Sequence, residues 1–225
     1  MSEYDQGILN EMFKDRPTKT SQPKDEILMI VDRSGSMSSI RDDAEGGVNT
    51  FISEQKTIEG AGANITLVEF DTVYDILCEG VDIQEAPSYK LTPRGGTALL
   101  DAIGQGVNSL SPADGTNVIV VVVTDGGENS SREFTHEAVT NLIKEKEEAG
   151  WEFLFLAANQ DAIQAGATMG FAANKSVNFA GTSDGVKFAY DVASTYTTSL
   201  RTKNKADALL DLEEVVKKGE QTDTE

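Results

Sequence analysis

The sequence contains one cysteine, one histidine and no long apolar run. Cys78 has no second cysteine to pair with, which excludes an intrachain disulfide and favours a reducing compartment, so the cytoplasm is the expected location. The single histidine, His136, lies near a different motif, and a Cys–His nucleophile is therefore not expected. The most apolar window, residues 118–123, is far too short to span a bilayer. Residues 1–6 have no basic region leading into an apolar stretch, so no signal peptide is expected.

Positive charge is scarce. The chain has 19 Lys and Arg residues against 38 Asp and Glu residues, which gives a formal net charge of −19. Such a field repels phosphate backbones and anionic lipid surfaces, so neither nucleic acid nor a membrane is an expected partner. The surplus of acids is interpreted as a solvated surface that aids solubility.

The length of 225 residues suits one large α/β domain with a short segment at each end. We expect an N-terminal arm at residues 1–24, one domain at 25–201 and an acidic C-terminal tail at 202–225 whose apolar residues have partly helical spacing. The arm has one apolar cluster, at positions 8, 9, 12 and 13. This spacing fits a short helix packed on the domain or an arm that a partner orders.

Short apolar runs alternate with helical stripes along the rest of the chain, which predicts an α/β fold. The runs at 26–31 and 117–123 are continuous and rich in β-branched residues, as expected for parallel strands covered on both faces. Two residues separate the runs at 64–70 and 73–78, a spacing that indicates an antiparallel hairpin. Further strands are expected at 151–157 and 176–179. The sequence thus predicts a doubly wound, Rossmann-like, mostly parallel six-stranded sheet with one antiparallel edge strand and helices on both faces.

The first apolar run ends in Asp32-Arg33-Ser34-Gly35-Ser36, a carboxylate followed by two hydroxyls. Ligands of open α/β sheets gather beyond the carboxyl ends of strands. Oxygen donors are what a hard cation such as Mg²⁺ prefers, and Asp32, Ser34 and Ser36 could supply three positions or their water-bridged equivalents. Taken alone, the pattern fits an Asx turn or a helix N-cap equally well.

Two later stretches strengthen the hypothesis of a metal site. Gly95-Gly96-Thr97 forms a loop before a helical stripe, and Thr124-Asp125-Gly126 follows the second continuous apolar run. In a doubly wound sheet all three stretches lie at the same edge. Together they resemble the metal-ion-dependent adhesion site (MIDAS) of von Willebrand factor type A (vWA) domains, and all five motif positions match: Asp32, Ser34, Ser36, Thr97 and Asp125. The resemblance covers roughly residues 25–200, and it is nearest to small stand-alone bacterial and phage proteins, including those of tellurium-resistance clusters.

The resemblance implies a function and a role for each motif residue. Ser34 and Ser36 are expected to bind Mg²⁺ or Mn²⁺ directly, Thr97 directly or through water, and Asp32 and Asp125 in either way. The cation would accept an Asp or Glu side chain from a partner protein, and no enzymatic activity is implied.

Three neighbours of the motif are expected to lie outside the ligand set. Arg33 fills the free position of the motif and is expected to face solvent. Asp101 and Asn129 are expected to form hydrogen bonds or caps rather than metal bonds.

Two other functions fit the sequence less well. A Mg²⁺-dependent phosphatase with Asp32 as nucleophile would need a second acid two residues later, where Ser34 stands, and no Lys or Arg is placed for a phosphate. A nucleotide-binding protein would need a Gly-x-x-x-x-Gly-Lys-Ser/Thr loop, which the sequence lacks. A metal-dependent protein-binding module is therefore the predicted function.

Overall fold

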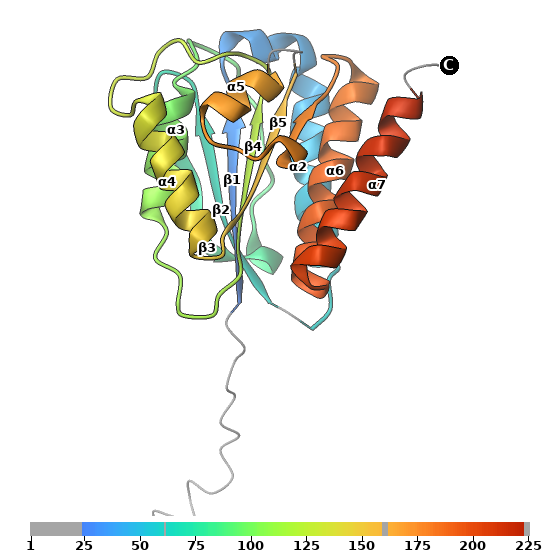
Figure 1. Ribbon diagram of the computed structural model, residues 1–225. Coiled ribbons are helices and arrows are strands. Elements are labelled where there is room, and N and C mark those ends of the chain that lie inside the picture. Colours follow the sequence, from blue (N-terminus) through green and yellow to red (C-terminus); the bar gives the residue numbers. More distant parts are fainter. Residues whose placement is uncertain (1–23, 61, 159–161, 223–225) are drawn as a thin grey trace, which may run out of the picture.

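The computed structural model describes residues 24–60, 62–158 and 162–222, so the predicted N-terminal arm lies outside the described residues except for Lys24. The described chain forms one six-stranded sheet in the order β3-β2-β1-β4-β5-β6 (Figure 1). Every neighbouring pair of strands is parallel except β2 and β3, which form the antiparallel hairpin at the edge. The predicted fold class is confirmed. The strands are β1 (Asp25–Asp32), β2 (Ala63–Phe70), β3 (Tyr74–Asp82), β4 (Val118–Thr124), β5 (Glu152–Ala157) and β6 (Ser176–Asn178).

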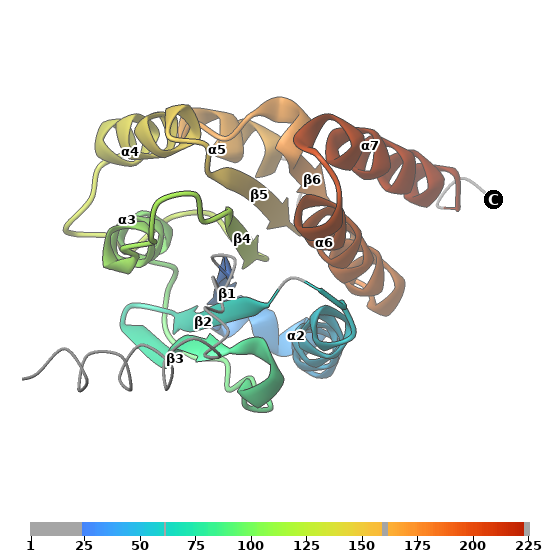
Figure 2. The same ribbon diagram turned by 90° about the horizontal axis from the view of Figure 1, so that it is seen from below.

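Helices cover both faces of the sheet (Figure 2). Helices α3, α4 and α5 lie over one face, and α2 and α6 lie over the other, with α7 outside α6. Their bounds are α2 (Arg41–Lys56), α3 (Leu99–Ser109), α4 (His136–Glu148), α5 (Ala162–Thr168), α6 (Ser183–Thr202) and α7 (Lys205–Thr222), and short 3₁₀ turns occur at η1 (Gly35–Ile40), η2 (Ile83–Glu85) and η3 (Ala173–Lys175).

The central strand β1 is covered on both faces, which explains why its sequence lacks polar alternation. Leu28 and Ile30 point into the apolar cluster beneath α3 and α4, whereas Ile27, Met29 and Val31 point into the cluster beneath α2 and α6. All five side chains are buried. A strand covered on both faces needs apolar residues at successive positions, and this burial fixes β1 and β4 as the rigid centre of the domain.

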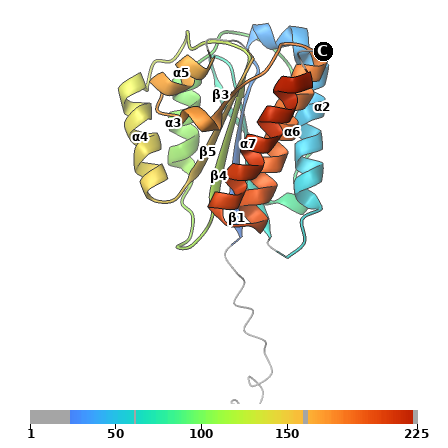
Figure 3. The same ribbon diagram turned by 45° about the vertical axis from the view of Figure 1, so that its right-hand side comes forward.

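Helix α7 packs along α6 on the outside of the molecule (Figure 3). Its residues Ala208 and Leu212 are buried in the same apolar cluster as α6, whereas Leu210, on the same helix, is 64% exposed. The tail therefore contributes to the core, and the proposed domain boundary at residue 201 stays a prediction. No helix within the described ranges is long and apolar enough to cross a bilayer.

Candidate metal site

The candidate site lies at the carboxyl ends of the two central strands, β1 and β4. Asp32 is the last residue of β1, and Thr124, the last residue of β4, is followed by Asp125. Because these strands are adjacent and parallel, their ends meet at one edge of the sheet. The loop before α3 reaches the same edge, where Gly35 N–H donates to Gly95 O at 3.1 Å and Arg94 N–H donates to Arg33 O at 2.7 Å.

Four of the five predicted site residues are joined by hydrogen bonds. The Ser34 backbone N–H donates to Asp32 Oδ1 at 2.6 Å, and Ser34 Oγ lies 3.0 Å from Ser36 Oγ. Ser36 Oγ in turn donates to Asp125 Oδ1 at 2.7 Å. The other oxygen of Asp32 accepts from Thr124 Oγ1 at 2.6 Å. The stretches after β1 and β4 therefore present their oxygens to one another, as the sequence predicts.

The fifth residue, Thr97, lies in the loop before α3 and is buried, at 3% exposure. Its backbone is held in place because its N–H donates to Asn129 Oδ1 at 2.9 Å and its carbonyl accepts from Asn129 N–H at 3.0 Å. A Cβ atom added to Gly126 would lie 3.5 Å from both Thr97 Oγ1 and Ser36 Oγ. The two hydroxyls thus converge beside one backbone position, and Gly126 leaves the space between them open.

Without a cation, the negative charges of the Asp32 and Asp125 carboxylates are energetically unfavourable. Burial raises the pKa of Asp32 to about 6, against the opposing effect of hydrogen bonds from Thr124 and Ser34, and the nearby charge of Asp125 adds to the increase. Burial also raises the pKa of Asp125, although Ser36 donates to it. Two desolvated carboxylates at the same sheet edge favour the binding of a cation, because its charge offsets both their desolvation and their mutual repulsion.

The donor set fits a hard divalent cation. It consists of three hydroxyls and two carboxylates, and all of these groups offer the oxygen ligands that Mg²⁺ and Mn²⁺ prefer. Across the part of the chain that the structure describes, no group of three or more His, Cys, Asp or Glu side chains could hold a metal. A site here would therefore depend on its hydroxyls as much as on its carboxylates.

Two neighbours of the site have the supporting roles predicted for them. Asp101 accepts hydrogen bonds from three successive backbone N–H groups, at residues 132 to 134, over 2.7 to 2.9 Å. Asn129 holds Thr97, as described above. Both residues thus form hydrogen bonds, as expected, and their place outside the ligand set stays a prediction.

The prediction that Arg33 faces solvent is wrong. Arg33 is 5% exposed, and its guanidinium forms ion pairs with Glu69, Asp71 and Asp75 of the β2–β3 hairpin. Sequence reasoning missed these three acids, since it treated Asp71 only as part of a turn. Topology does place the end of β2 at the same sheet edge as the Asp32–Ser36 stretch, but it does not give the pairing of these acids with the Arg33 side chain.

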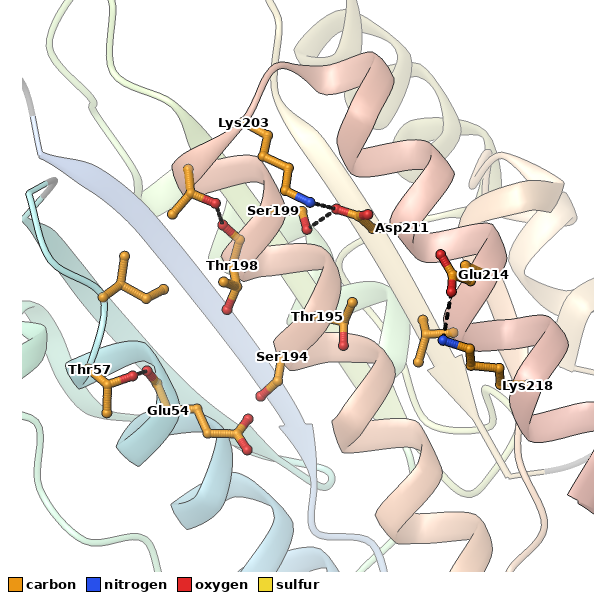
Figure 4. Close-up of a pocket in the computed structure, with 13 residues that line it drawn as sticks. Glu54, Thr57, Ser194, Thr195, Thr198, Ser199, Lys203, Asp211, Glu214 and Lys218 are labelled. Atoms are coloured by element: carbon orange, nitrogen blue, oxygen red, sulfur yellow. Dashed lines mark hydrogen bonds and ion pairs between the residues drawn. The ribbon is translucent and has the colours of Figure 1, made fainter.

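A groove of about 520 Å³ lies elsewhere, between α2, α6 and α7 (Figure 4). Hydroxyl groups of α6 line it, and the ion pairs Lys203–Asp211 and Lys218–Glu214 cross its α7 side, each at 2.6 Å. Four of its five charged side chains are thus paired with one another, and it shares no residue with the candidate metal site.

We expect Gly126→Ala to weaken metal binding without disturbing the fold. The added methyl would occupy the space between Thr97 Oγ1 and Ser36 Oγ, and the backbone at Gly126 is not in the left-handed region. The metal dissociation constant, measured by isothermal titration calorimetry, should increase by roughly tenfold, the lower end for changes beside metal ligands. Gly127→Ala is the matched control, because a Cβ there meets nothing within 4 Å. Equal affinities in the two variants would contradict this placement of the site.

Comparison with known proteins was informative only at the level of structure. No family model matches the chain, and no curated protein sequence matches it. The vWF domain of the type V pili tip protein Mfa5 from Porphyromonas gingivalis superposes with a TM-score of 0.61 at 12% identity, over 82% of this chain and 98% of that one.

Two further solved structures are similar over only part of their length. The pilus adhesin SpaC from Lactobacillus rhamnosus GG matches with a TM-score of 0.60 at 15% identity, over 80% of this chain and 31% of that one. Proximal thread matrix protein 1 from the mussel byssus, with a zinc-occupied MIDAS motif, matches with a TM-score of 0.58 at 13% identity, over 77% and 46%. The chain thus spans less than half of these two proteins. At such identities the likeness shows the fold, and the chain has a vWA-like fold.

Proposed function

We propose that this protein is a divalent-cation-dependent protein-binding module that holds Mg²⁺ or Mn²⁺ at Asp32, Ser34, Ser36, Thr97 and Asp125. The observation that carries the proposal is the convergence of three hydroxyls and two carboxylates at one sheet edge, where the Ser36 and Thr97 hydroxyls both lie beside Gly126. The nature of the donors favours Mg²⁺ or Mn²⁺ over softer metals, because all of them are oxygens.

The arrangement suggests how a partner is recognised. When bound, the cation would supply an open coordination position whose charge the hydroxyl-rich shell leaves largely unneutralised. Ser36 is exposed, so that position would be reachable from solvent. The partner therefore presents an Asp or Glu side chain, with basic residues around it that complement a chain of net charge −19.

The comparisons support this proposal through the kinds of protein that share the fold. The similar structures are those of a pilus adhesin, a pilus tip protein and a matrix protein with zinc at its MIDAS motif. An adhesin and a protein with a metal-occupied MIDAS motif support a binding role for this chain rather than a catalytic one. The closer kinship with stand-alone bacterial and phage proteins, and the cytoplasmic location, stay predictions.

The geometry favours binding over a phosphatase. A phosphatase would need a cationic side chain free to hold phosphate, and the Arg33 guanidinium beside Asp32 is instead occupied by three carboxylates. Arg94, the next arginine along this edge, is paired with Asp71 at 2.6 Å. Ser34 also stands where a second catalytic acid would be needed.

Affinity capture from the lysate of the source cell tests the proposed function. We expect one or more proteins to be retained by the full chain in millimolar Mg²⁺, released by EDTA and absent when Asp125→Ala is the bait. The same preparation should not hydrolyse p-nitrophenyl phosphate. Capture that survives both EDTA and the Asp125 substitution would contradict the metal site as the interface, and metal-dependent hydrolysis would favour the phosphatase.

A further inference from the structure

Arg33 lies between two candidate metal ligands in the sequence, yet its side chain turns away from them. Its Nε donates to Asp71 Oδ2 at 2.9 Å, and its two terminal nitrogens pair with Glu69 and Asp75. The Arg33 backbone forms two more hydrogen bonds: its N–H donates to Phe70 O at 2.8 Å, and its carbonyl accepts from Arg94 N–H at 2.7 Å. This one residue therefore connects the metal-site stretch to two other loops.

Asp71 is the second centre of this network. It is 1% exposed, and its Oδ2 accepts from both Arg33 Nε and Arg94 Nε, the latter at 2.6 Å. Its Oδ1 accepts from the Val73 N–H at 2.7 Å, and its backbone carbonyl accepts from the Ala98 N–H at 2.8 Å. One carboxylate thus joins the β2–β3 turn to both arginines, and its main chain is bonded to the residue after Thr97.

The loop that carries Thr97 passes directly against Asp71. Gly95 has a φ of +68°, and a Cβ atom there would lie 3.3 Å from Asp71 Cβ. Only a glycine adopts this conformation and approach without strain. The position of Thr97 is therefore set from both sides, by Asn129 on one and by Asp71 with Arg94 on the other.

We infer that Arg33 and Asp71 are positioning residues of the metal site, which hold the Thr97 loop in register with Ser34 and Ser36. The inference rests on the proposed function. A buried ion-pair cluster by itself is weak evidence for stability, since desolvation of its charges offsets much of their attraction. The contribution of this cluster is to fix the relative positions of the three loops that it joins. Two of these loops present candidate ligands, which come from segments more than sixty residues apart in the sequence.

The test compares Asp71→Asn with Glu152→Gln in the full chain. Glu152 is a matched control, because it is also a buried carboxylate with two cationic partners, Lys175 at 2.7 Å and Lys205 at 2.8 Å. It begins β5 and so lies at the opposite end of the sheet from the site. An asparagine at position 71 retains the shape but cannot accept from both arginines and from Val73 N–H as a carboxylate does.

We expect Asp71→Asn to increase the dissociation constant for Mg²⁺ or Mn²⁺ by about 10- to 100-fold, the range typical of residues that orient metal ligands. Circular dichroism should show a retained fold, and Glu152→Gln should bind metal as the wild type does even if it melts earlier. Arg94→Gln offers a second, milder variant, because the Arg94 side chain is 57% exposed and its loss removes only one donor to Asp71. It should weaken metal binding several-fold without threatening the fold.

The outcomes separate this inference from the proposed function. Metal binding by the wild type with unchanged affinity in Asp71→Asn and Arg94→Gln would contradict the positioning role alone. Equal losses in Asp71→Asn and Glu152→Gln would also contradict it, since they would reflect stability rather than geometry. An absence of metal binding by the wild type would contradict the proposed function and this inference with it.

Discussion

Replacing Asp32 with asparagine should abolish the response of the protein to Mg²⁺ and, at the same time, make the metal-free protein more stable at pH 7. The Asp32 side chain is fully buried, and its pKa is raised from 3.8 to about 6, so its charge is costly in the metal-free fold. A shift of this size corresponds to about 3 kcal/mol, and the asparagine avoids this cost while its Oδ1 still accepts from the Ser34 N–H. We expect a net gain of about 1–3 kcal/mol in EDTA, since the amide must also rearrange its contact with Thr124.

Metal binding should change in the opposite direction. Removing one charge of a buried pair costs about 2–5 kcal/mol, which corresponds to a loss of metal affinity of at least about 30-fold. Urea unfolding of wild type and Asp32→Asn, each in EDTA and in millimolar Mg²⁺, measures both effects. Asp82→Asn is a suitable control, because Asp82 lies at the end of β3 and pairs with Lys24 at 2.7 Å. An Asp32→Asn protein that Mg²⁺ stabilises as much as the wild type would show that the ion is elsewhere.

Metal affinity should fall steeply as the pH drops below about 6. The folded-state pKa of Asp32 lies above its unfolded value, so the folded protein takes up a proton on acidification before the unfolded chain does. For the metal-free protein this means that the destabilising effect of the Asp32 charge is present above about pH 6 and is relieved as the pH falls toward 4. A bound cation requires the deprotonated Asp32 carboxylate, so the proton and the cation compete for it. The affinity for the cation should therefore fall about tenfold per pH unit below 6.

Calorimetric titration of Mg²⁺ at a series of pH values between 7.5 and 5 measures this dependence. The pKa of Asp125 is raised in the same direction, so its protonation would steepen the loss. The ion-paired acids behave differently: burial raises the pKa of Asp71, but the hydrogen bond from Arg94 and the charge of Arg33 lower it overall. Its contribution to stability is lost only as the pH falls through and below its ordinary range near 3.8. An affinity that is constant from pH 7 to pH 5 would contradict a role for Asp32 at the metal.

Much of the fold could be predicted because its signals are local. The continuous apolar runs that became β1 and β4 are unusual in length and composition, and the two residues between β2 and β3 leave little choice but a hairpin. The meeting of Asp32, Ser36 and Asp125 followed from the parallel order of those strands, because parallel neighbours end at the same sheet edge. Topology alone was enough to bring them together.

The surroundings of Arg33 could not be predicted in the same way. Its partners, Glu69, Asp71 and Asp75, lie 36 to 42 residues away, and periodicity gives the face of a strand but not the partner of a side chain. Nor does the sequence show that Thr97 is buried, which depends on how Asn129 holds its backbone.

The most direct test of the account is isothermal titration calorimetry of Mn²⁺ and Mg²⁺ into the metal-stripped full chain at about pH 7.5. We expect saturable binding of one ion per chain, lost in Asp125→Ala, together with a rise in melting temperature that EDTA reverses. A hundredfold excess of the free ion over its dissociation constant should stabilise the fold by about 2.7 kcal/mol. An absence of heat and of any shift in melting temperature, or binding that Asp125→Ala leaves unchanged, would contradict the assignment of these five residues to a metal site.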